Sequence, residues 1–220
     1  MDNLSLFQTI VVWAIPVLFA ITVHEVSHGF VASRLGDPTA RMLGRLTLNP
    51  IKHVDPLGTV VLPLLMMLMT RGAFVFGWAK PVPVTPQNLR NPKRDMALVA
   101  AAGPISNLLM ALLWAILMRV AIASSPEPGS GVMFLFYMSD AGIQINIFLA
   151  VLNMIPLPPL DGGRVAVGLL PGPLSWQLSR IEPYGFFILI ALLYSHVLDF
   201  ILHPVISSLF GLYIAIGGMG

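Results

Sequence analysis

The chain alternates between long apolar stretches and shorter polar ones. Three apolar stretches, at about 6–32, 96–120 and 132–157, have the roughly 20 residues that a helix needs to cross the hydrocarbon core of a membrane. A fourth, at 184–218, is interrupted by the pair His203 and Pro204, so we expect one crossing and a second, less complete one there. The pattern predicts an all-α polytopic membrane protein, a bundle of about 5–6 transmembrane segments.

Between the first two long stretches the pattern indicates other kinds of structure. The apolar run 57–70 contains Pro63 and is short for a crossing, which favours a re-entrant or interfacial segment. A short strand is expected at 40–48, between two sets of turn residues. Residues 74–84 are rich in aromatic and β-branched side chains and end in alternating prolines. They predict a small β element, an edge strand or hairpin with one edge blocked.

Positive charge is concentrated in one part of the chain. Nine of the twelve Lys and Arg residues lie between Arg34 and Arg94, whereas residues 122–139 have none. Because positively charged loops stay on the cytoplasmic side, we expect 33–95, with the β element, to be cytoplasmic. The first and third long stretches then run in the same direction, from outside to inside. We expect a multi-pass protein of the inner (plasma) membrane.

Composition narrows the class of protein further. Hydrophobic residues make up 56% of the chain, charged residues 10%, and the mean hydropathy is +0.84. These values are typical of an integral protein of the lipid bilayer, and we expect a single domain over 1–220, with a core at about 6–170 and C-terminal helices at about 184–218. The absence of cysteine excludes disulfides and thiolate metal sites. The charge pattern gives no support to nucleic-acid binding.

The first apolar stretch carries three unusual side chains, His24, Glu25 and His28. A charged acid near the centre of a membrane helix costs at least about 2.5 kcal/mol, so a compensating role is expected. On a helix, His-Glu-x-x-His places two imidazoles one turn apart on one face, where both can bind one Zn²⁺. The carboxylate then lies beside the open coordination position. We assign Glu25 as the general base and later proton donor to the leaving amine.

A third zinc ligand is expected where the third long stretch ends. Pro156, Pro158 and Pro159 cannot continue a helix, so the backbone must unwind there. Unwound backbone is tolerable at membrane depth only where it is buried in protein or lines a water-filled cavity. Asp161 follows in a conspicuous turn at the depth of the two histidines, and we assign it as the third ligand of one Zn²⁺ per chain. Asn153 could hydrogen-bond a developing oxyanion.

Together these residues resemble the site-2 protease family, the intramembrane zinc metalloproteases. The resemblance covers roughly residues 10–170, and its three elements occur in family order. They are His24-Glu25-x-x-His28, Gly103-Pro104-x-x-Asn107 and Asn153-x-x-Pro-x-Pro-Pro-Leu-Asp161-Gly-Gly. The resemblance is to a compact member without a PDZ or CBS domain.

This family resemblance implies a reaction and its residues. The reaction is hydrolysis of peptide bonds in or near transmembrane helices of substrate proteins. His24, His28 and Asp161 would bind zinc, Glu25 would act as the base, and Asn153 would stabilise the substrate carbonyl. The β element at 74–84 would be a small membrane-associated β element that aligns an unwound substrate by strand addition.

Other interpretations stay open. A metal- or proton-coupled transporter would use the same side chains as a relay, but it predicts ionisable residues along a path and an inverted repeat. A membrane haem protein needs axial histidines on facing helices. Asp161 could be a simple turn residue, Asn153 could satisfy backbone groups freed by the prolines, and Asn107 could serve helix packing or the active site. We expect His53 to be a solvated interfacial residue.

Overall fold

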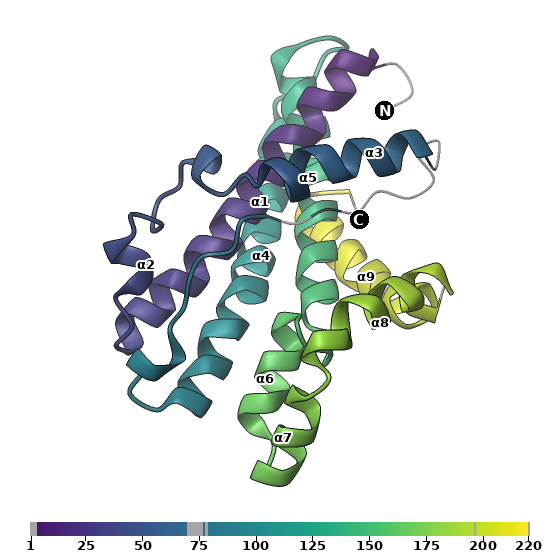
Figure 1. Cartoon of the computed structure of the whole chain (residues 1–220). Helices are drawn as coiled ribbons and strands as arrows, with labels where there is room; N and C mark the ends of the chain where they lie inside the picture. Colours follow the sequence, from purple (N-terminus) through teal and green to yellow (C-terminus); the bar gives the residue numbers. More distant parts are fainter. Residues whose placement is uncertain (1–3, 70–76, 78, 196, 220) are drawn as a thin grey trace.

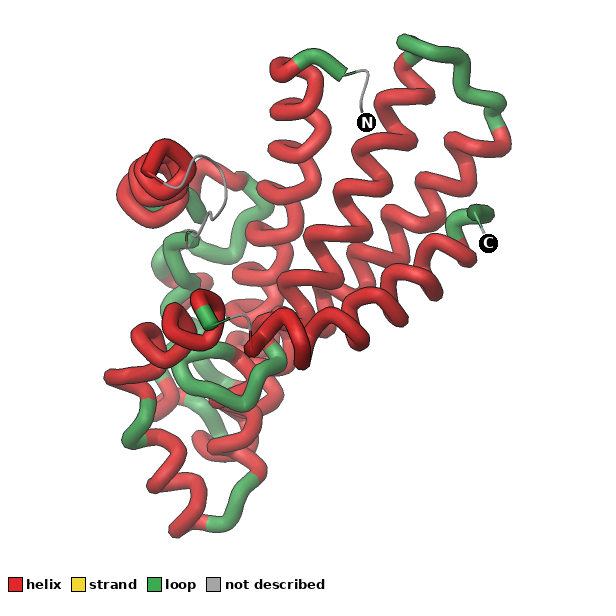
Figure 2. Tube along the Cα trace, turned by 90° about the vertical axis from the view of Figure 1, so that its right-hand side faces the viewer, coloured by secondary structure: helices red, strands yellow, loops and turns green. Residues whose placement is uncertain are grey.

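The computed structural model describes residues 4–69, 77, 79–195 and 197–219, and the regular structure in this part of the chain is helical (Figures 1 and 2). The α-helices are α1 (Leu6–Leu35), α2 (Thr39–Met42), α3 (Leu62–Met69), α4 (Pro92–Ala123), α5 (Gly131–Asn153), α6 (Asp161–Leu169), α7 (Gly172–Ser179), α8 (Glu182–Tyr194) and α9 (Val197–Ile216). Three short helical turns complete the set: η1 (Pro50–Lys52), η2 (Pro56–Val61) and η3 (Pro86–Asn88).

Four of these helices, α1, α4, α5 and α9, are long and apolar enough to cross a membrane. The described residues therefore support four crossings rather than the expected 5–6, because α3 and α8 have only 8 and 13 residues. Large apolar side chains cover the outside of the long helices; Leu109 is 63% exposed and Phe200 86% exposed. Such a surface suits hydrocarbon rather than water.

The last apolar stretch is interrupted earlier than expected. Helix α8 ends at Tyr194 and α9 begins at Val197, whereas His203 and Pro204 both lie inside α9. The expected break at this pair is therefore wrong. Proline is tolerated in membrane helices where neighbouring groups satisfy the freed backbone, and Pro104 lies inside α4 in the same way.

The two expected strands are not found in the described residues. Residues 40–48 form the end of α2, a turn and irregular chain. Of the expected β element, residues 74–76 and 78 lie outside the described part, while 79–84 have no strand partner. The N–H groups of Lys80 and Val82 bond instead to a loop carbonyl and to a side chain. Helix α3 lies crosswise to α1 (Figure 1), an orientation that fits an interfacial or re-entrant segment.

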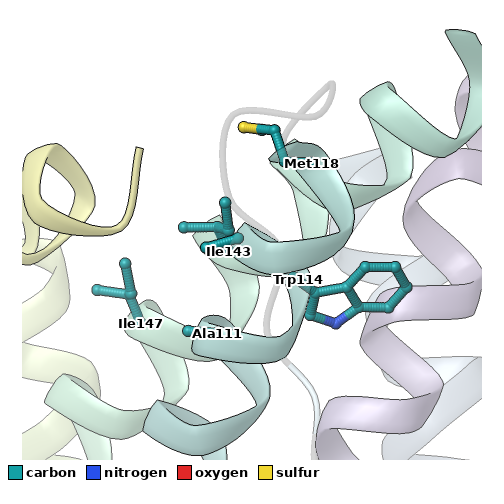
Figure 3. Packing of buried hydrophobic residues seen from close by; sticks show 6 residues of the cluster. Ala111, Trp114, Met118, Ile143 and Ile147 are labelled. Atoms are coloured by element: carbon teal, nitrogen blue, oxygen red, sulfur yellow. The ribbon is translucent and has the colours of Figure 1, made fainter. Parts of the chain in front are cut away.

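Helix α4 is the centre of the bundle and packs against α1, α5, α6 and α9. Small side chains on α4 let its neighbours approach closely, as is usual between membrane helices. One buried cluster joins α4 to α5 (Figure 3), and its members are Ala111, Trp114, Ala115, Met118, Ile143 and Ile147. Residues of α9 pack against this cluster from the side, and the Tyr213 hydroxyl donates a hydrogen bond to the Leu108 carbonyl. The resulting core holds α5 and α9 against α4.

One end of the bundle gathers the end of α1 and the start of α4. The backbone N–H of Arg90, just before α4, donates to the Leu35 carbonyl at the end of α1, 3.1 Å away. Lys93 on α4 also donates to the Leu170 carbonyl behind α6. Helix α5 ends at Asn153, the chain is unwound over 154–160, and α6 begins at Asp161, as the prolines predict. The unwound segment therefore places α6 at the end of the bundle where α1 ends and α4 begins.

Candidate metal centre

His24 and His28 lie one turn apart on α1, and Asp161 is the first residue of α6. All three side chains are buried, with 8%, 9% and 7% of their residue surfaces exposed. Asp161 Oδ2 lies 3.1 Å from His24 Nε2 and 3.4 Å from His28 Nε2. One potential ligand atom from each residue lies within 4.8 Å of the other two. The three residues predicted to share a metal are therefore brought together.

The outer nitrogen of each imidazole has a defined partner. His28 Nδ1 lies 2.7 Å from the Val99 carbonyl oxygen on α4. A carbonyl can only accept, so Nδ1 carries the proton and donates. In a neutral ring, the lone pair is then on Nε2, which faces Asp161.

His24 has the same orientation, fixed by a side-chain amide. Its Nδ1 lies 2.6 Å from Asn107 Oδ1. The Asn107 amide nitrogen donates to the Ala20 carbonyl at 3.3 Å and to Asn146 Oδ1 at 2.9 Å, and Asn146 in turn donates to the Gly142 carbonyl. Because both backbone carbonyls can only accept, they determine which way each amide points. Asn107 must therefore present oxygen to His24, which leaves the His24 Nε2 lone pair facing Asp161.

In this arrangement the lone pairs of His24 Nε2, His28 Nε2 and Asp161 Oδ2 face one another. Asp161 Oδ2 is buried and has no hydrogen-bond donor among the described residues. An ionised carboxylate and two neutral imidazoles with outward hydrogen bonds form the donor set of a divalent cation such as Zn²⁺. The residues present fit that metal.

Helix α4 can approach the imidazoles only because residue 103 is glycine. A Cβ atom there would lie 2.5 Å from His28 Nε2 and 2.6 Å from His24 Cε1. Any side chain would push both rings away from Asp161. Gly103, which the sequence motif singles out, therefore gives the two imidazoles their space.

Glu25 lies on the neighbouring face of α1 and is partly buried. Its Oε2 accepts a hydrogen bond from the backbone N–H of Val82 at 2.7 Å. Val82 belongs to the non-helical residues 79–85 that precede η3. The carboxylate expected to act as a base is thus held by a part of the chain that sequence reasoning assigned to a strand.

Asn153 does not take part in the three-residue cluster. It is the last residue of α5, partly buried, and its amide nitrogen donates to the Leu149 carbonyl one turn earlier, at 2.9 Å. An amide has a second N–H, which this contact leaves for another acceptor. The expected oxyanion role of Asn153 stays a prediction.

Three other site residues were not assigned by sequence reasoning. They are Asn146, the Val99 carbonyl and the Val82 N–H. A signal existed for Asn146, because an amide inside an apolar span needs a partner in the same way as Asn107 does. Backbone groups carry no such signal in the sequence. His53 was expected to be solvated, but it is 2% exposed, and its Nε2 lies 2.8 Å from the Thr47 carbonyl.

Comparison with curated proteins finds related sequences. "Putative zinc metalloprotease YwhC" of Bacillus subtilis is 35% identical over 198 residues, which cover 88% of this chain and 85% of that protein. "Putative zinc metalloprotease Rip2" of Mycolicibacterium smegmatis is 30% identical over 183 residues, covering 83% of this chain and 66% of that protein. "Putative zinc metalloprotease MJ0611" of Methanocaldococcus jannaschii is 35% identical over 88 residues, 40% of each chain. No family model and no solved structure matches.

Proposed function

The chain belongs to the protein family of "Putative zinc metalloprotease YwhC", and from this premise we propose that it is an intramembrane zinc endopeptidase of the site-2 protease type. Its substrates are membrane proteins, which it cleaves within or near their transmembrane segments in regulated intramembrane proteolysis. The observation that carries the proposal is the buried set of His24, His28 and Asp161, with ligand atoms within 4.8 Å of one another. This set lies in a bundle with an apolar outer surface, where membrane segments of a substrate are within reach.

The protein's own residues divide the reaction between them. His24, His28 and Asp161 would hold one Zn²⁺, which when bound supplies a Lewis acid that polarises the scissile carbonyl and lowers the pKa of water to about 7. Glu25 takes a proton from the attacking water as the new C–O bond forms. It then gives this proton to the amine nitrogen as the C–N bond breaks. The products are a carboxylic acid and an amine.

Asn153 is proposed to stabilise the carbonyl oxygen that becomes negative during the attack. Its position at the end of α5, directly before the unwound segment that leads to Asp161, supports this role. One N–H of its amide donates to Leu149, and the second would serve the oxyanion.

The membrane orientation is part of the proposal. Basic residues are concentrated near the end of α1 and the start of α4, the end of the bundle that also receives α6. By the positive-inside rule this end faces the cytoplasm of a cell bounded by an inner (plasma) membrane. The active site then lies near the cytoplasmic face.

A metal- or proton-coupled transporter is the alternative, and it is less favoured. Transport needs ionisable groups along a path through the bundle. In this chain the three ligand residues gather at one place, and the relatives are named as metalloproteases.

The test compares the membrane proteomes of cells that carry the wild-type protein or Glu25→Gln. Glutamine is close in size but cannot accept the proton, so membrane peptides should accumulate only in the variant. Glu127→Gln is the matched control, because Glu127 is an exposed carboxylate in the loop between α4 and α5. Identical proteomes for wild type and Glu25→Gln would reject the protease, and metal flux that depends on Glu25 would support transport instead.

A further inference from the structure

Residues 80–85, which we call the strap, run along α1 beside the candidate metal centre. The strap is fixed at both ends by its backbone. At one end, the Lys80 N–H donates to the His53 carbonyl at 2.9 Å. At the other end, the Thr85 N–H donates to Asp37 Oδ2 at 2.7 Å. Asp37 directly follows the C-cap of α1 and is fully buried, so the strap is tied to the helix that carries the histidines.

A side chain from a neighbouring loop holds the strap from outside. Arg45 Nη2 donates to the Lys80 carbonyl at 2.9 Å and to the Pro81 carbonyl at 3.4 Å. With this contact, the strap is fixed immediately before the point at which it meets α1. The strap therefore has little freedom to slide along the helix.

The middle of the strap, Pro81-Val82-Pro83, has a single N–H group, because proline has none. That group, on Val82, donates to Oε2 of Glu25 at 2.7 Å. Within the described part of the chain it is the one hydrogen-bond donor to this carboxylate. A bond between an N–H group and an ionised carboxylate is about twice as strong as a neutral one.

The fit of Val82 on α1 depends on Gly29, one turn after Glu25 and on the same face. A Cβ atom at residue 29 would lie 2.7 Å from Val82 Cγ1 and 2.7 Å from Leu46 Cδ2. Val82 is only 7% exposed, so its side chain is packed against the helix. Packing at Gly29 and the hydrogen bond at Glu25 thus fix Val82 at two successive turns of α1.

We propose that the strap positions the general base: the Val82 N–H holds one oxygen of Glu25 so that the other oxygen is left to take the proton from water. A glutamate side chain has several rotatable bonds, and fixing one carboxylate oxygen removes most of its alternative orientations. Val82 acts through Glu25 and is a positioning residue. The two prolines ensure that no neighbouring N–H competes for the carboxylate. This inference rests on the proposed protease function.

Val82→Pro tests the strap, because it removes the N–H while keeping an apolar side chain. The substrate is the membrane peptide that accumulates in Glu25→Gln cells, purified and labelled with a fluorophore. We expect kcat to fall about tenfold to a hundredfold, with KM and zinc content unchanged. Val82→Ala keeps the N–H and should lose far less activity than Val82→Pro.

Lys80→Pro is the matched control, since it removes another N–H of the strap that does not reach Glu25. It should lower the thermal unfolding midpoint and reduce kcat far less than Val82→Pro does, because the Val82 N–H still donates to Glu25. If Val82→Pro does not fold, replacing Val82 by its α-hydroxy acid analogue, 2-hydroxyisovaleric acid, changes the N–H to an ester oxygen and leaves the side chain intact. The corresponding ester at Lys80 is then the control, and the expected kinetic effects are the same.

The possible outcomes distinguish a failure of the strap from a failure of the proposed protease function. Wild-type kcat without the Val82 N–H, in a system where Glu25→Gln is inactive, would overturn the strap alone. A higher KM with unchanged kcat would also overturn it, because the strap would then bind substrate rather than position the base. If no membrane peptide accumulates in Glu25→Gln cells, the proposed protease and the role of the strap both fail.

Discussion

Asn107 accepts a hydrogen bond from His24 Nδ1 at 2.6 Å, and this contact determines which imidazole nitrogen faces Asp161. The sequence motif Gly103-Pro104-x-x-Asn107 left the role of the asparagine open between helix packing and active-site support. The contact joins the two roles, because one amide binds α1, α5 and the histidine. Asn107 therefore links the packing of the bundle to the orientation of His24.

Replacing Asn107 by leucine should weaken zinc binding. Leucine has a similar size but no acceptor, so His24 can rotate or change tautomer. A hydrogen-bond partner of a metal-binding histidine typically contributes tenfold to a hundredfold to metal affinity. Competition with a chromophoric chelator on purified protein measures the affinity. Ser139→Ala, which removes a buried polar group of the neighbouring helix α5, should leave the affinity unchanged; equal losses in both variants would assign the effect to packing.

The three proposed ligands should each be required for zinc. Purified protein should hold about one zinc per chain, and His24→Ala, His28→Ala and Asp161→Ala should each remove it, because two ligands bind zinc too weakly. Metal analysis after dialysis measures this. Glu182→Gln, which alters an exposed ion pair with Arg164 at 3.8 Å, is the control and should retain zinc. Full zinc content in Asp161→Ala would remove that residue from the ligand set.

Gly103→Ala should disrupt the site by size alone. The added Cβ would lie 2.5 Å from His28 Nε2, so the ring or α4 must move. We expect loss of zinc and of cleavage, with the bundle still folded. Gly211→Ala on α9 is the matched control, because nothing lies within 4 Å of a Cβ atom there. Its effect on the stability of the protein should be neutral or slightly favourable. Normal zinc binding by Gly103→Ala would show that the packing near the histidines is looser than described.

Asp37 should make stability depend on pH. Burial favours the neutral form, but hydrogen bonds from Thr39, Asn88 and Thr85 outweigh it and lower the pKa of Asp37 from 3.8. The ionised form is therefore favoured by folding. Its stabilisation is fully present above pH 3.8 and is lost as the pH falls through the lowered pKa.

Asp37→Asn tests this dependence. At pH 7 the variant should lose about 2 kcal/mol, because an amide group faces the donors that a carboxylate accepts. Thermal unfolding in detergent, followed from pH 7 to pH 3, should show the wild type approaching the variant at the acid end. A constant difference across this range would contradict the assignment to the Asp37 charge.

The sequence was informative where a polar side chain interrupted an apolar pattern. His24 and His28 stood out in this way, and the charge bias of the loops placed Asp161 at the same end of the bundle. The expected strands do not form in the part of the chain that the structure describes, because β propensity does not reveal whether a partner strand exists. The Val82 N–H could not be foreseen, since its acceptor is distant in sequence. Apolar length alone also overestimated the crossings, because the short helices α3 and α8 share the composition of the long ones.

The proposed ligands lie in parts of the chain that the ribosome makes at different times. His24 and His28 lie on α1, which leaves the ribosome first, whereas Asp161 begins α6, after α4 and α5. A nascent chain that has inserted only α1 and α4 holds the two imidazoles but lacks Asp161, so it cannot complete the proposed donor set. The proposed hydrolysis therefore becomes possible only after the central helices are in the membrane, so an unfinished chain would not cleave its neighbours during synthesis.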